Sequence, residues 1–147
     1  MSGTVVNIVV GYVLTPEGKA AVERAAELAA ESDGELHLVG VVALPRNDSE
    51  AREYQQRRTA DQKQLEHAAQ GFESKGIRSR AHIPNAVTRP SEAILGVAKS
   101  VEASLIVIGM RRRSKVGKLV LGSTAQEILL DSTCDVLSVK APKAQPD

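Results

Sequence analysis

Aromatic residues are almost missing from this sequence. Two Tyr, one Phe and no Trp make up 2% of the 147 residues, so few rings could stack on the bases of a single-stranded nucleic acid. Cysteine is nearly missing as well: Cys134 stands alone, which excludes an intrachain disulfide scaffold. We therefore expect a protein that neither binds nucleic acid nor depends on disulfide bonds for its stability.

Long apolar runs are also lacking. No stretch approaches the ~18 apolar residues of a membrane-spanning helix. The N-terminal sequence MSGTVVNIVVGYV lacks the basic start and the long apolar core of a secretion signal. These absences predict a cytoplasmic protein with no membrane contact. The length fits a single domain over residues 1–147, with about 1–4 and 141–147 flexible.

The sequence does contain a regular alternation of strand-like and helix-like segments. Short apolar, β-branched runs predict strands at 5–10, 36–44, 77–83, 105–108 and 136–139. Amphipathic segments between them predict helices at 16–32, 51–75, 90–101 and 123–130. This order predicts an α/β fold with a five-stranded parallel sheet and helices on both faces.

One segment differs from the rest in its charge. Residues 111–118 carry five positive charges and no negative one, which leaves −4 for the other residues of a chain whose formal net charge is +1. A Gly-Ser-Thr sequence at 122–124 then opens the last predicted helix. Unpaired N–H groups and the helix dipole attract anions at such an N-terminus, and hydroxyls can add donors. The segment therefore indicates a site for a small anion such as phosphate, unless it is simply a solvated loop.

A parallel sheet would bring this segment to a crevice. Ligands of such folds bind outside the carboxyl ends of the strands, at the point where the strand order reverses. If the first and fourth strands are neighbours, the loops after Val10 and Ile108 meet there. Tyr12 follows the first strand and is a candidate for ligand contact, with packing as the alternative.

Motifs that would point to other activities are absent. The pair Gly117-Lys118 is followed by Leu, where a P-loop has Ser or Thr, and no Gly-x-Gly-x-x-Gly fingerprint or Gly-x-Ser-x-Gly elbow occurs. The histidines, His37, His67 and His82, are widely separated in the sequence, so we expect structural or solvent-facing roles for each. No metal site and no catalytic residue is predicted.

The spacing after the fourth predicted strand resembles that of the universal stress protein family. Its nucleotide-binding members carry Gly, two residues, Gly, nine residues, and then Gly followed by Ser or Thr. Gly109, Arg112, Gly122 and Ser123 keep each of these spacings, with Arg112 in place of the second glycine. The opening VVGY, the strand LIVIG and the ending CDVLSVK also fit, so the resemblance covers nearly the whole chain.

The resemblance implies strand order 3-2-1-4-5, the adenine nucleotide alpha hydrolase-like fold. It also implies a stress-response protein that binds ATP or another adenine nucleotide, with or without Mg²⁺, between the first and fourth strands. Members form homodimers through the last strand. The residues that it assigns to nucleotide binding are Gly11, Tyr12, Val13, Val41, Gly109, Arg112, Arg113, Gly122, Ser123 and Thr124.

Within this set the resemblance implies distinct roles. The two glycines of the spacing let the backbone approach phosphate closely, and Ser123 and Thr124 donate hydrogen bonds to it. Arg112 and Arg113 neutralise its charge. The backbone near Val41 holds adenine.

Two positions depart from the family pattern. Val13 stands where the family has an acidic residue that holds adenine or ribose. Arg112 could either block the phosphate or bind it through its guanidinium. A signalling or interaction dimer of the same fold that has lost nucleotide binding is therefore the alternative function. Slow ATP hydrolysis rests on the resemblance alone, and no residue of the crevice offers a general base, so an enzyme is not predicted.

Overall fold

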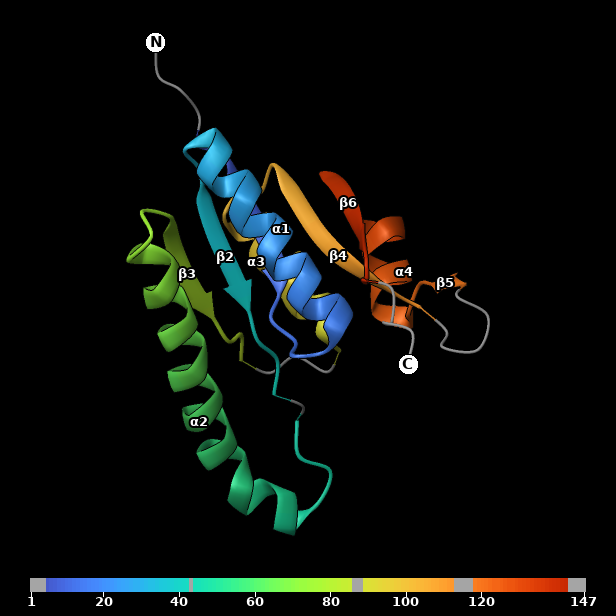
Figure 1. The fold of residues 1–147 in the computed structure, drawn as a ribbon. Coiled ribbons are helices and arrows are strands. Elements are labelled where there is room, and N and C mark those ends of the chain that lie inside the picture. The colour runs from blue at the N-terminus through green and yellow to red at the C-terminus, as the bar shows by residue number, and fades with distance from the viewer. Residues whose placement is uncertain (1–4, 43, 86–88, 113–117, 143–147) are drawn as a thin grey trace, which may run out of the picture.

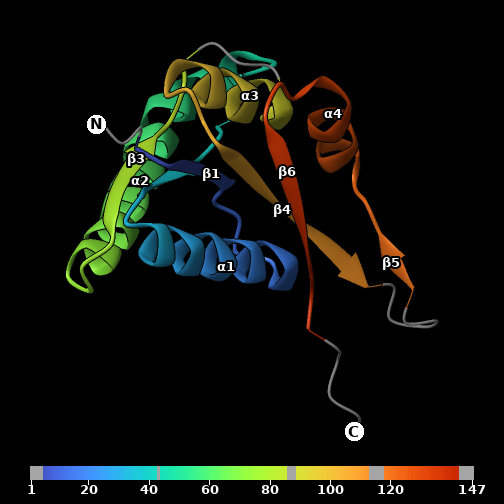
Figure 2. The ribbon, with the colours of Figure 1, turned by 90° about the horizontal axis from the view of Figure 1, so that it is seen from above.

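The computed structural model describes residues 5–42, 44–85, 89–112 and 118–142. Figures 1 and 2 show a sheet placed between two layers of helices. In chain order, the elements are β1 Asn7–Gly11, α1 Pro16–Ser32, β2 Glu35–Val39, α2 Asp48–Glu73, β3 Arg78–His82, α3 Pro90–Ser100, β4 Leu105–Arg112, β5 Leu119–Val120, α4 Ser123–Asp131 and β6 Asp135–Lys140.

Five strands form the predicted parallel sheet, in the order β3-β2-β1-β4-β6. The sequence did not predict one further strand, the two-residue β5, which pairs antiparallel with the end of β4. This pairing lies in the basic segment, where β4 continues through Arg111 and Arg112 instead of ending at Ile108. Part of the predicted basic loop is therefore a small antiparallel ribbon.

Two helices cover each face of the sheet (Figure 2). Helices α1 and α2 pack on one face, and α3 and α4 on the other. Alternate side chains of β1 point to opposite faces of the sheet. Ile8 and Val10 pack with α1 and α2, whereas Val9 packs with α3 and α4. Because both faces are covered, the strand reads as a nearly continuous apolar run.

Side-chain caps set where the helices begin. Thr15 Oγ1 accepts a hydrogen bond from the N–H of Gly18 at 3.1 Å, and Pro16 occupies the first helical position, where the predicted helix 16–32 begins. Helix α2 begins earlier than the predicted residue 51, because Asn47 caps it by accepting from the N–H of Glu50 at 2.9 Å.

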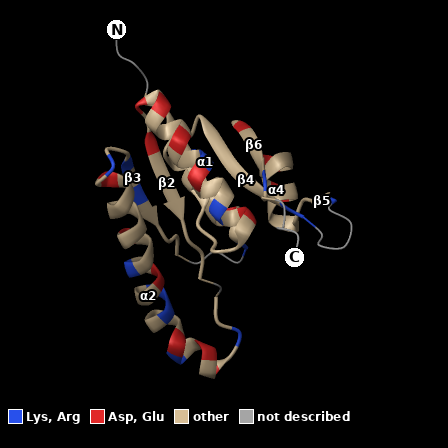
Figure 3. Ribbon diagram, viewed as in Figure 1, with Lys and Arg blue, Asp and Glu red and all other residues tan. Residues whose placement is uncertain are grey.

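Helix α2 is long and polar. Leu65 and Ala69 are its buried residues. Its first half extends past the carboxyl edge of the sheet (Figure 1), and charges of both signs lie along it (Figure 3). The helix therefore keeps most of its surface in water.

Two chain boundaries differ from prediction. The strand expected at 36–44 ends at Val39, because the chain turns away from the sheet after Gly40, whose N–H donates to the carbonyl of His82 at 2.9 Å. Ala141, predicted to be in a flexible tail, is 4% exposed, and its N–H donates to the Met110 carbonyl at 2.9 Å. It therefore belongs to the packed domain. The predicted flexible segments 1–4 and 143–147 lie outside the described residues.

Candidate functional site

A crevice of about 420 Å³ opens at the carboxyl ends of β1 and β4, where the strand order reverses. Its walls come from the loop after β1, the first turns of α1 and α4, the end of β4, and β5. Ile94 of α3 contributes an apolar part of the wall. Among the predicted site residues, the crevice brings together Gly11, Val13, Gly109, Gly122, Ser123 and Thr124.

The N-terminus of α4 supplies the hydrogen-bond donors of the crevice. Gly122 is the N-cap, so no side chain caps the helix, and no acidic residue lies in its first turn. The hydroxyls of Ser123 and Thr124 make no hydrogen bond with any described residue. Backbone N–H groups, two hydroxyls and the positive end of the helix dipole thus remain open to an anion.

Gly109 and Gly122 are glycines for different structural reasons. A Cβ at Gly109 would overlap the carbonyl of Glu17, so this glycine lets the start of α1 pack against β4. A Cβ at Gly122 would meet nothing within 4 Å, and the backbone there has an ordinary φ of −72°. Packing therefore explains Gly109, whereas Gly122 keeps open space beside the helix N-terminus.

The arginines of the basic segment point in different directions. Arg112 Nε donates to the carbonyl of Ala141 at 2.9 Å, so its guanidinium lies against the end of β6. Arg111, which the sequence reasoning did not select, lines the crevice and forms no ion pair with any described residue. Figure 3 shows this positive charge along the end of β4 beside β5. Arg113, also a predicted site residue, lies outside the described part of the chain.

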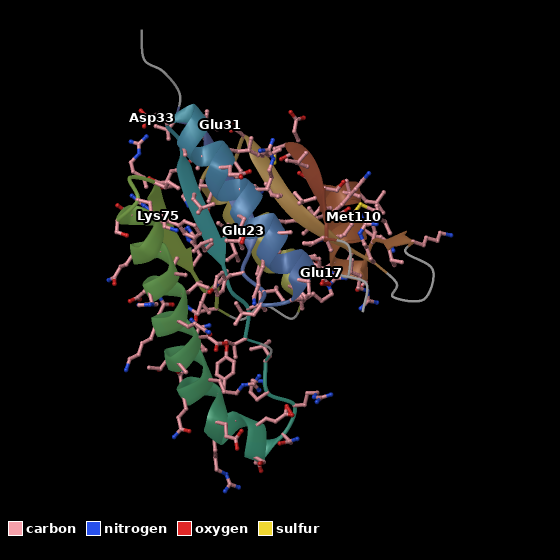
Figure 4. All side chains as sticks on the ribbon, viewed as in Figure 1. Glu17, Glu23, Glu31, Asp33, Lys75 and Met110 are labelled. Atoms are coloured by element: carbon pink, nitrogen blue, oxygen red, sulfur yellow. The ribbon has the colours of Figure 1, made fainter. Side chains whose placement is uncertain are left out.

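A carboxylate in the crevice was also missed by sequence reasoning. Glu17, in the first turn of α1, lines the crevice and makes no ion pair or side-chain hydrogen bond with described residues. Figure 4 labels it at the start of α1, with Met110 near the end of β4. Val13 lines the same crevice with an apolar side chain that is 53% exposed. An acid in the first turn of the helix after β1 is the sequence signal that could have identified Glu17.

Two other predicted contacts lie elsewhere. Tyr12 packs against the core between the sheet and helices α1 and α2, which favours the packing alternative, and its N–H donates to the Val39 carbonyl at 2.8 Å. Val41 packs against the core under α3 and α4. Neither side chain is among those that line the crevice.

A histidine pair lies across β2 and β3. His37 is buried, with 1% of its surface exposed, and its Nε2 lies 3.0 Å from Asn7 Oδ1 and 3.2 Å from Glu35 Oε1. Its Nδ1 lies 2.9 Å from Nε2 of His82. Sequence separation did not suggest this pairing, but the expectation of a structural role agrees with the burial. In the described residues, no group of three potential metal ligands occurs.

Burial sets the protonation of this pair. The pKa of His37 is lowered from 6.5 to about 4, first by burial and then by the nearby His82; Glu35 opposes this lowering, and Arg80 adds the smallest contribution to it. The pKa of His82 is lowered as well, first by burial and then by Arg80. Both rings are therefore neutral near pH 7, one donating and the other accepting.

None of the described helices has the length and apolar character to cross a membrane.

A family model described as the universal stress protein family matches residues 5–140. A universal stress protein of Mycolicibacterium smegmatis is 36% identical over 133 residues, covering 90% of this chain and 96% of that protein.

Two solved structures are similar in fold. A universal stress protein from Archaeoglobus fulgidus in complex with dAMP matches with a TM-score of 0.64 and 21% identity, covering 90% of this chain and 96% of that one. A universal stress protein family protein from Arabidopsis thaliana with AMP bound matches with a TM-score of 0.65 and 18% identity, covering 93% of this chain and 92% of that one.

Proposed function

Since the chain belongs to the universal stress protein family, we propose that its crevice binds an adenine nucleotide, ATP or another, with or without Mg²⁺. The observation that carries this proposal is the uncapped N-terminus of α4, which aims backbone and hydroxyl donors into the crevice. The similar folds determined with dAMP and AMP support the choice of adenine nucleotides. A role in the stress response and a cytoplasmic location are parts of the same proposal.

The phosphate end of the nucleotide would lie at α4. Ser123 and Thr124 would donate from their hydroxyls and backbone, and Gly122 leaves room for a phosphate oxygen. Arg111, which has no ion pair with a described residue, would neutralise the phosphate charge from the end of β4. Arg112 and Arg113 remain candidates for this role, although the guanidinium of Arg112 already bonds the end of β6.

The nucleoside end would be held less firmly. The side chain of Val13 offers no acceptor to adenine or ribose, and Glu17 is the crevice carboxylate that could accept from a ribose hydroxyl. The backbone near Gly11 and Val41 would contact the base. Most of the binding free energy would therefore come from the phosphates.

Calorimetric titration of the full chain with ATP, ADP, AMP and adenosine, each with and without Mg²⁺, tests this proposal. Affinity should fall in that order as phosphates are removed. If no nucleotide binds, or if adenosine binds as tightly as ATP, the proposal is wrong.

Single substitutions test which arginine neutralises the phosphate charge. Arg111→Gln should weaken ATP binding by about tenfold to a hundredfold, because a charge-assisted hydrogen bond contributes about 1.5–3 kcal/mol. Arg52→Gln, on the exposed side of α2, is the matched control. Arg112→Gln should have a smaller effect than Arg111→Gln. The reverse order would mean that Arg112, and not Arg111, neutralises the phosphate charge.

A nucleotide-free interaction dimer is the second candidate function. Val13 in place of the acid favours it, and both candidates share a homodimer through the outer edge of β6, which pairs only with β4 among the described strands. Sedimentation at micromolar concentration should give a dimer mass, and a monomer would contradict this part. Mass spectrometry of denatured, freshly purified protein separates the two functions, because released nucleotide would exclude the second.

A further inference from the structure

A second hollow, here called the α1–α2 groove, lies on the face of the sheet that α1 and α2 cover. Its volume is about 330 Å³, and it runs between the first half of α1 and the last turns of α2. Its apolar lining comes from Tyr12, Val13, Leu14, Val22, Ala68 and Phe72. The nucleotide crevice, by contrast, lies between α1 and α4.

The groove is apolar and open to solvent. Leu14, at its mouth, is 53% exposed, one of the few large apolar side chains on the described surface with more than a third of their area in water. Tyr12 and Phe72 lie partly buried below it, against the core. Concave apolar surface that the protein leaves uncovered is typical of a ligand site.

Charges at the rim of the groove favour an anion. Lys19 and Lys75 line the groove together with a single acid, Glu23. None of the three has an ion pair with any described residue. Lys75 Nζ lies 5.9 Å from the centre of the Phe72 ring, so one ammonium group lies directly over the apolar floor. Figure 4 labels Glu23 on α1 and Lys75 just after α2, on the two sides of the groove.

The groove differs from the crevice in the chemistry it offers. Its lining has no helix N-terminus; α1 contributes Lys19, Val22 and Glu23, beyond its first turn. The polar groups that it presents are therefore chiefly charged side-chain ends above an apolar floor. A ligand with a long apolar part and a small anionic head matches this arrangement better than a phosphorylated sugar does.

We propose that the α1–α2 groove binds an anionic amphiphile of medium chain length, such as a C8–C10 carboxylate. The alkyl chain lies along Val22, Ala68 and Phe72, and the carboxylate lies between the ammonium groups of Lys19 and Lys75. This proposal does not rest on the proposed nucleotide binding in the crevice.

Titration of the ¹⁵N-labelled full chain with hexanoate, octanoate and decanoate, followed by NMR below the micelle concentration, tests the proposal. Binding should saturate at one ligand per chain and perturb the amides around Tyr12, Leu14 and Phe72. Each added methylene should tighten binding by roughly fourfold if it is buried. Absence of saturable binding, or equal binding of decyltrimethylammonium, would overturn the proposal.

Glycine variants provide a matched pair. Gly71 lines the groove on α2, and a Cβ there meets nothing within 4 Å, so the backbone has room for a side chain and Gly71→Leu should fill part of the groove. Leucine is also the better helix former. Gly71→Leu should weaken decanoate binding at least tenfold, whereas Gly96→Leu, at an equally open helical glycine of α3, should leave it unchanged. Equal binding by both variants would exclude the groove as the site.

Charge variants test the head group. Lys19→Gln and Lys75→Gln should each weaken decanoate binding several-fold and leave binding of decanol unchanged. Lys63→Gln, on the exposed side of α2, is the control. If both lysine variants bind decanoate as tightly as the parent chain does, the proposed selectivity for an anionic head group is wrong.

Discussion

His37 Nδ1 lies 2.9 Å from His82 Nε2, so one hydrogen bond joins two imidazoles across neighbouring parallel strands. The bond needs one ring to donate and the other to accept. One added proton can be accommodated, because a charged ring can still donate to a neutral partner. Two cannot, since both facing nitrogens would then carry hydrogen. This pair ties β3, at the edge of the sheet, to β2.

The stability of the fold should therefore fall in mild acid. The pKa of His37 is lowered by burial to about 4 from 6.5. Between these values the unfolded chain binds more protons than the folded one, so the free energy of unfolding decreases as pH falls. From pH 7.5 to pH 5, His37 alone accounts for on the order of 2 kcal/mol. Urea unfolding at a series of pH values measures this slope.

Variants of two histidines separate this effect from general acid sensitivity. His37→Gln should flatten the slope between pH 7.5 and pH 5, and His67→Gln, on the exposed side of α2, should retain it. The explanation fails if His37→Gln unfolds with the same pH dependence as the parent chain.

The same substitution at two glycines should have different consequences. Gly109→Ala places a methyl group against the backbone of Glu17 and should lower the free energy of unfolding by about 1–3 kcal/mol. Gly122→Ala meets open space and should cost less than about 1 kcal/mol, through a poorer N-cap. Thermal and urea unfolding of the two variants make the comparison, and an equal loss in both would contradict it.

Thr15 should stabilise α1 through its hydroxyl. Thr15→Ala removes the acceptor for the Gly18 N–H and should cost about 1 kcal/mol of unfolding free energy. Thr15→Ser keeps the acceptor and should be close to the parent chain. Urea unfolding of the pair is the measurement. Equal destabilisation by both substitutions would mean that the methyl group, not the cap, is responsible.

Ser91 and Glu127 should couple α3 to α4. Ser91 is 1% exposed, and its hydroxyl donates to Glu127 Oε2 at 2.7 Å; Arg89 Nη1 lies 3.1 Å from the same oxygen. Glu127→Ala leaves the hydroxyl without its acceptor and should cost about 1–3 kcal/mol. In a double-mutant cycle with Ser91→Ala, the combined loss should be smaller than the sum of the single losses. Simple additivity would show that the two side chains act independently.

The fold could be predicted because its signals are local. The short apolar run at 5–10 predicted the first strand, and the amphipathic pattern at 16–32 predicted the helix that follows it. The position of the crevice could be predicted as well, because the order of strands and helices determines which loops meet at the carboxyl edge of the sheet.

The side chains that face the crevice depend on pairing that sequence periodicity does not give. Arg111 and Arg112 are neighbours on an extended strand, so they point to opposite sides, and the pairing of β4 with β5 and β6 determines which of the two lines the crevice. Of the next pair of neighbours, Tyr12 lines only the groove, whereas Val13 lines both the groove and the crevice. The contact between His37 and His82 follows from the β2–β3 register, in which Val39 is the partner of His82.

Val13 lines both the crevice and the α1–α2 groove. The loop that it belongs to is therefore a wall common to two hollows on opposite sides of α1. A shift of this wall that tightens one hollow alters the shape of the other. Thermodynamic linkage then requires reciprocity: whatever factor an occupant of the groove applies to affinity in the crevice, an occupant of the crevice applies in return to the groove.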